Sequence, residues 1–116
     1  MEKKIYKLLN ELGVPFGCVG RDYIERAVEI IREKGRVAIT KDLYPTIAKQ
    51  FCATSSAVER GIRHAIERAQ DNLGNGFIKQ VFGNTISLKS GKLTNSDFIY
   101  GVVKYLEIHN KENSNE

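Results

Sequence analysis

The sequence lacks several features that would mark a membrane, secreted or metal-binding protein. Its 116 residues include no tryptophan, two prolines and two cysteines, Cys18 and Cys52, which form no CxxC pair. No apolar run approaches the roughly 18 residues of a membrane span, and the charged, periodic start MEKKIYKLLNELG is not a signal peptide. We therefore expect a cytoplasmic protein without a membrane segment, whose cysteines are reduced and behave as small hydrophobic residues.

Residues suited to catalysis or to metal binding are equally sparse. The two histidines and two cysteines lie on separate segments, so they lack the spacing of metal ligands. The glycine-bearing stretches GNG and GVPFGCVG do not end in GK[ST], as a phosphate-binding loop would. Ser55 and Ser56 have no evident base beside them. The sequence predicts no enzyme, no cofactor and no metal site.

The composition is that of a folded, mildly basic domain. Apolar residues make up 41% and charged residues 28% of the chain, as in an ordinary globular protein. The net charge is +4, but three acids and one lysine in residues 107–116 contribute −2, so residues 1–106 carry +6. A basic body of this size permits a polyanionic partner without requiring one.

Apolar spacing and turn residues divide the chain into helices. The predicted helices cover residues 5–12, 22–35 with Asp22 as the cap and Gly35 as the stop, 44–51, 55–70 and 94–108. Between them we expect a short extended link at 36–39, a loop at 71–76, one or two helical turns at 77–83, and a short strand or extended arm at 84–92. The polar end should fray. The fold class is all-α: a single domain of five or six helices over residues 1–110, with a polar tail at 111–116.

Two of these helices have the spacing of a helix-turn-helix, at about residues 43–70. Small Ala48 allows the helices to cross closely, and Val58 and Ile62 give the second helix an apolar stripe. Gly61 also permits close approach, although it costs about 1 kcal/mol of helix propensity. Cys52 stands in the turn where glycine is common, and because a cysteine disfavours positive φ, we expect a slightly different turn.

The opposite face of the second helix suits DNA. The guanidinium of Arg60 matches the two acceptors of guanine, and Glu59 can accept from cytosine. Both lie in the N-terminal half that a helix-turn-helix inserts into the major groove. Ser55 and Ser56 suit phosphates at the positive helix end. The remaining candidates for phosphates or neighbouring bases are Arg63, His64, Lys41, Lys89 and Lys92.

The same residues also fit a solvated surface helix without a ligand. Glu59 follows Ser56 by three residues, so the two could form a capping box. His64 fits an ordinary surface histidine, and Glu67 can pair with Arg63 one turn away. These alternatives stay open on periodicity alone.

Several separated motifs resemble one known family. The stretches ELGVP, LYPTIAKQF, VERGIRHAIERA and FGNTISLKSGKLTNSDFI occur in its order, over residues 5–108. They are similar to the DNA-binding effector domain of the stage zero sporulation protein A response regulators. The resemblance implies a six-helix domain that binds a short DNA box, often in tandem copies, and regulates transcription through RNA polymerase.

By position, the resemblance makes Glu59 and Arg60 base-reading residues and brings Ser56, Arg63 and His64 to the DNA. It implies a contact of residues 76–82 with a polymerase sigma factor, and contacts between tandem protomers through the last helix. The resulting prediction is a sequence-specific, bacterial DNA-binding regulator, located at the nucleoid when bound to double-stranded DNA.

Two departures from the family bear on function. Where the family carries a base-reading arginine, this chain has Ala57, and one such contact is worth about 1–3 kcal/mol of discrimination. The family's receiver domain is also missing, and Met1 with the polar tail favours a complete short protein over an excised domain. The alternative function is an interaction protein that binds a full-length regulator or RNA polymerase with little DNA selectivity of its own.

Overall fold

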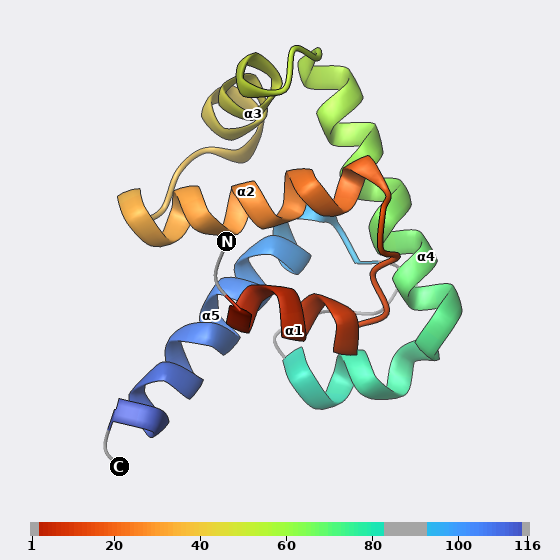
Figure 1. Cartoon of the computed structure of the whole chain (residues 1–116), viewed down its shortest axis with the longest axis vertical. Coiled ribbons are helices and arrows are strands. Elements are labelled where there is room, and N and C mark those ends of the chain that lie inside the picture. Colours follow the sequence, from red (N-terminus) through yellow and green to blue (C-terminus); the bar gives the residue numbers. More distant parts are fainter. Residues whose placement is uncertain (1–2, 83–92, 115–116) are drawn as a thin grey trace.

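The chain folds into helices around one apolar core (Figure 1). The computed structural model describes the backbone of residues 3–82 and 93–114, and the side chains of 3–72 and 93–109. These residues form five α-helices, α1 (Lys3–Glu11), α2 (Val19–Lys34), α3 (Tyr44–Gln50), α4 (Ser55–Phe82) and α5 (Asn95–Ser114), and a π-helical turn, η1 (Ile39–Leu43). The prediction of an all-α domain is confirmed.

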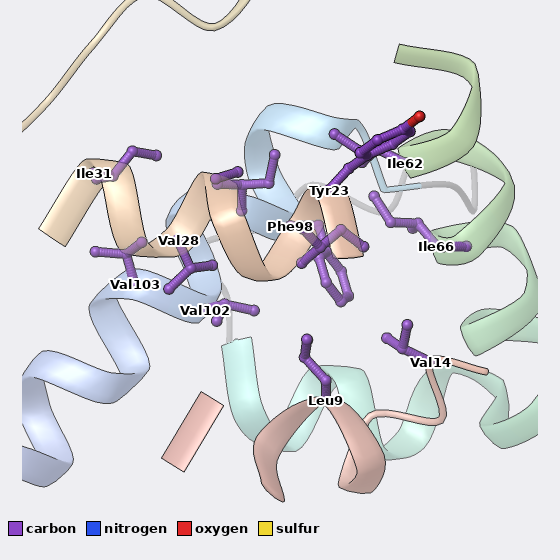
Figure 2. Packing of buried hydrophobic residues seen from close by; sticks show 14 of the residues in the cluster. Leu9, Val14, Tyr23, Val28, Ile31, Ile62, Ile66, Phe98, Val102 and Val103 are labelled. Atoms are coloured by element: carbon purple, nitrogen blue, oxygen red, sulfur yellow. The ribbon is translucent and has the colours of Figure 1, made fainter. Parts of the chain in front are cut away.

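Apolar side chains from all five helices meet in the core. Phe98 of α5 is fully buried at its centre, beside Leu9 of α1 and Ile62 and Ile66 of α4 (Figure 2). The predicted inward positions of the first two helices are buried as well, among them Ile5, Leu8, Ile24, Ala27 and Ile31. The 3.6-residue apolar period therefore identified the packing faces correctly.

The second helix begins four residues earlier than predicted. It starts at Val19, its N-cap is Cys18, and Asp22 lies in the first turn instead of capping it. The sequence misled because Gly20 reads as a loop residue, whereas here it sits against Gly61 of α4. A Cβ at Gly20 would lie 2.0 Å from the Gly61 carbonyl oxygen, so the close crossing of α2 and α4 requires this glycine.

The loop predicted at residues 71–76 is wrong, because α4 continues through this segment to Phe82. Of the helical turns predicted at 77–83, residues 77–82 are its last part, and α4 changes direction along its length (Figure 1). Asn72 donates a 3.0 Å hydrogen bond to the carbonyl of Gly13, which ties this stretch to the end of α1. Such tertiary contacts offset the low helix propensity of DNLGNG.

The other segment predictions have mixed outcomes. Ala38 is extended, but Ile39 already belongs to η1. Thr94 caps α5 as expected, accepting a 3.1 Å hydrogen bond from the N–H of Asp97. α5 stays helical to Ser114, so residues 111–114 of the predicted polar tail continue it. The strand or arm expected at 84–92 lies outside the described residues.

Arg21 is a buried charge that sequence reasoning did not single out. Its side chain, in a residue only 2% exposed, donates to the carbonyls of Val14 (2.9 Å) and Tyr6 (3.1 Å) and pairs with Glu25 at 3.1 Å. The guanidinium also stacks over the ring of Phe16. These bonds satisfy the charge and fix the loop between α1 and α2.

Candidate nucleic-acid interface

α3 and α4 form the predicted helix-turn-helix, and their shared face is buried as expected. Ala48 is 5% exposed, and Val58 and Ile62 are fully buried. Gly61 faces α2, where a Cβ would lie 3.0 Å from a ring carbon of Tyr23. The second helix is therefore fixed by its contacts with both α2 and α3, and the face opposite these contacts is left to solvent.

The turn between α3 and α4 contradicts the expectation for Cys52. Its φ is +54°, so the cysteine adopts the left-handed conformation that glycine usually supplies. The N–H of Ala53 bonds the carbonyl of Ala48 at 2.8 Å, which is the six-residue closure of a Schellman turn. This closure and the burial on either side hold Cys52 there, against a cost of about 1–2 kcal/mol for a non-glycine residue. Neither cysteine forms a disulfide.

The first turn of α4 is capped by Thr54. Its hydroxyl accepts a 3.0 Å hydrogen bond from the N–H of Ala57. The alternative of a capping box between Ser56 and Glu59 is therefore wrong, since the reciprocal position is occupied by Ala57, which has no carboxylate. The hydroxyls of Ser55 and Ser56 stay outside the cap, and their N–H groups, at the first two helical positions, have no acceptor within the helix.

The solvent face of α4 carries the predicted polar residues. Ser56, Arg60, Arg63 and His64 are exposed, while Glu59 is half-buried. Within the part of the chain whose side chains are described, Arg60 makes no hydrogen bond and no ion pair. At the start of this helix, Arg63 pairs with carboxylates whereas the guanidinium of Arg60 has no partner among the described residues.

Arg63 lies between two carboxylates. It bonds Glu59 at 3.1 Å and approaches Glu67 to 3.9 Å, so the predicted pair with Glu67 exists but is the longer of the two. All three side chains are 38–49% exposed. Exposed pairs of this kind are worth a few tenths of a kcal/mol, so they would not prevent Arg63 from binding an anion.

A hollow of about 360 Å³ joins η1, α3 and the start of α4. Its lining consists of Thr40, Tyr44, Ser55, Ser56, Glu59, Arg60 and Arg63. Five of the predicted site residues thus meet in one place. His64 instead lines a second hollow, between α4 and the start of α2, and exposed Lys41 lines neither. Lys89 and Lys92 lie outside the described residues.

Tyr44 lines the hollow and Asn95 bonds two residues of its lining, Tyr44 and Glu59; neither Tyr44 nor Asn95 was predicted as a site residue. Asn95, the first residue of α5, donates to the Tyr44 hydroxyl at 2.9 Å and to the Glu59 carbonyl at 3.1 Å. Burial raises the pKa of Tyr44 above 10.0; the bond from Asn95 opposes this shift and the charge of Glu59 adds to it. Tyr44 and Asn95 lie 51 positions apart in the sequence, so no local sequence pattern could have predicted that they contact each other.

The described residues offer little other chemistry. They contain no group of three or more His, Cys, Asp or Glu side chains that could hold a metal ion. None of the described helices combines the length and apolar character needed to cross a membrane. What remains is a helix-turn-helix whose second helix presents serines, arginines and a glutamate.

A family comparison agrees with this geometry. The model of the family described as "Sporulation initiation factor Spo0A C terminal" matches residues 5–106, most of the chain. The match includes the whole of α2 and α3, the turn after them, and the described face of α4. The chain therefore belongs to the family of the sporulation initiation factor Spo0A C-terminal domain, the DNA-binding domain of a transcription regulator of sporulation.

Proposed function

We propose that this chain is a sequence-specific DNA-binding transcription regulator that inserts the first turns of α4 into the major groove. The proposal rests on the exposure of Arg60 and on its lack of a partner among the described residues. This arginine lies in the second turn of α4, on the face opposite the buried stripe, exposed and without a partner among the described side chains. An uncommitted guanidinium at this place can bond both acceptors of a guanine without first losing an internal contact.

The other candidate site residues divide into base and backbone roles. Glu59 is a second base reader, which accepts from cytosine with the carboxylate oxygen that Arg63 leaves free. Ser55 and Ser56 bind phosphate through their hydroxyls and the N–H groups of the helix start. Arg63 and Lys41 add attraction to the backbone, and His64, Lys89 and Lys92 are further candidates for this role.

Ala57 limits what the protein can read. The residue is half-buried and has no side-chain donor or acceptor. The base pair facing it can be recognised only through apolar contact, such as with a thymine methyl group. We therefore expect a relaxed or altered box at this position. Contacts of residues 76–82 with a sigma factor, and of α5 with a tandem protomer, stay predictions.

Selection of bound duplexes from random DNA, followed by titration, tests the proposal. Arg60→Ala should lower the preference for the selected box over a scrambled one by about 1–3 kcal/mol. Arg63→Ala should weaken binding to both duplexes equally and reduce the salt slope by about 1. Lys104→Ala removes the same charge from an exposed position of α5 and serves as the control.

The outcomes separate the two candidate functions. If Arg60→Ala and the parent discriminate equally between the duplexes, sequence reading by α4 is refuted. If the selection yields no consensus and the chain instead captures a full-length regulator or RNA polymerase without DNA, the interaction-protein function replaces it. Ala57 is the feature that favours that second candidate.

A further inference from the structure

Tyr44 is a buried residue whose hydroxyl lies at the proposed DNA surface. It is the first residue of α3, only 6% exposed, and it lines the hollow together with the start of α4. Among the residues that the structure describes, its hydroxyl has one hydrogen-bond partner, Asn95, at 2.9 Å. If Asn95 is the donor in this hydrogen bond, the Tyr44 hydroxyl keeps its own proton free to donate to a group in the hollow.

The carbonyl of Glu59 settles the direction of that bond. A carbonyl oxygen can only accept, so the Asn95 atom 3.1 Å from it must be the NH₂ nitrogen. The same nitrogen lies next to the Tyr44 oxygen, and an NH₂ group only donates. The Tyr44 oxygen therefore accepts, and its own proton must point elsewhere.

That proton has no acceptor among the side chains and backbone groups that the structure describes. Buried donors without a partner are rare in native proteins, so the acceptor for this proton must come from the hollow, as water or as a bound group. The hollow in front of Tyr44 offers mainly donors, namely two arginines and the N–H groups at the start of α4. Its one carboxylate, Glu59, bonds Arg63 through one oxygen, and neither of its oxygens accepts a hydrogen bond from the Tyr44 hydroxyl. A site rich in donors and cations suits an anion with several oxygens.

We infer that Tyr44 donates a hydrogen bond to a backbone phosphate of bound DNA, and that Asn95 is the positioning residue that makes Tyr44 a donor. The inference rests on the proposed DNA-binding function and adds two residues to it. Asn95 does this from α5, so it also joins the last helix to both helices of the helix-turn-helix. The hydroxyl is protonated at neutral pH, as for any tyrosine, and burial raises the pKa of Tyr44 further.

Fluorescence anisotropy with the selected duplex tests the inference. Tyr44→Phe keeps the ring and removes the donor, and it should weaken binding to selected and scrambled duplexes alike by about 10- to 150-fold, as expected for a hydrogen bond to a charged group. The ratio between the duplexes should not change, because a phosphate carries no sequence information. Tyr100→Phe is the matched control, since its hydroxyl bonds the carbonyl of Val37 instead of lining the hollow.

A scan of single methylphosphonate substitutions distinguishes a direct contact from a loss of structure. At one phosphate, the methylphosphonate should weaken DNA binding by the parent protein. It should not weaken binding by Tyr44→Phe any further, because the hydrogen bond that it removes is already absent in that variant. Asn95→Asp replaces the NH₂ donor by a carboxylate that captures the Tyr44 proton. This variant should lose the coupling at the same phosphate and at no other.

Three results would overturn the inference. Tyr44→Phe could bind as tightly as the parent, or its loss could be independent of every single phosphate; either leaves the proposed function intact. If the parent itself binds no duplex at low salt, both the inference and the proposed function fail. Thermal melting of each variant identifies the folded fraction, and the affinities are compared per folded molecule.

Discussion

The crossing of α2 and α4 at two glycines gives the sharpest stability prediction. In Gly20→Ala the new Cβ would lie 2.0 Å from the carbonyl oxygen of Gly61 and 2.7 Å from its carbonyl carbon. Ordinary van der Waals contact begins at 3.4 Å, so the two backbones must separate by more than 1 Å. Neither atom belongs to a flexible side chain that could move aside. The substitution therefore forces apart the two helices on which the position of the DNA-facing helix depends.

The magnitude follows from two opposing effects. Replacing glycine in a helix gains at most about 1 kcal/mol. Overpacking a core costs about 1–3 kcal/mol and more when backbone must move. Because separation also loosens Val58 and Ile62 from the core, we expect a net loss of about 3 kcal/mol. For a domain of this size that loss lowers Tm by about 12 °C.

Urea unfolding followed by circular dichroism measures the free energy of unfolding. Gly61→Ala is the matched control at the same crossing, since its Cβ would meet the Tyr23 ring at 3.0 and 3.1 Å instead of a backbone. A ring can shift by a few tenths of an ångström, so this variant should stay within about 1 kcal/mol of the parent. Equal stability of Gly20→Ala and the parent would refute the reasoning.

Three further predictions concern single contacts, each measured by urea unfolding. Thr54→Ala removes the cap of α4 and should destabilise by about 1 kcal/mol, whereas Thr54→Ser should retain most of the stability; equal losses would contradict the cap. Cys52→Gly should stabilise by up to about 1 kcal/mol because the left-handed conformation no longer strains the residue, and Cys52→Val should destabilise; the reverse order would contradict the positive φ. The folded state holds the Tyr44 proton more tightly than the unfolded chain, so the parent should lose stability as the pH rises above about 10.0. Tyr44→Phe should lose less over the same range, and parallel pH profiles would show that Tyr44 does not contribute.

Periodicity was enough to predict the helical fold and the two faces of α4. Val58 and Ile62 recur at helical spacing and are buried, while Arg60 and Arg63 fall on the other face and are exposed. This works because a helix has one geometry, so the pattern of apolar residues alone fixes which side can pack.

Segments with glycine were predicted less well. Gly20 was read as part of a loop and the stretch 71–76 as a break, yet both are helical. Local propensity is worth about 1 kcal/mol per residue, and contacts from distant parts of the chain exceed it. At Gly20 the contact is the carbonyl of Gly61, which no local pattern includes.

The hollow at the start of α4 shows most clearly which features follow from the sequence and which follow only from the tertiary structure. The sequence by itself determined that serines, arginines and a glutamate share one helical face, because their spacing is a property of a single helix. Only the tertiary structure decided that Tyr44 and Asn95 stand behind that face, 51 positions apart in the chain. Their bond depends on where α5 begins relative to α3 and α4, and packing of the whole core fixes that place.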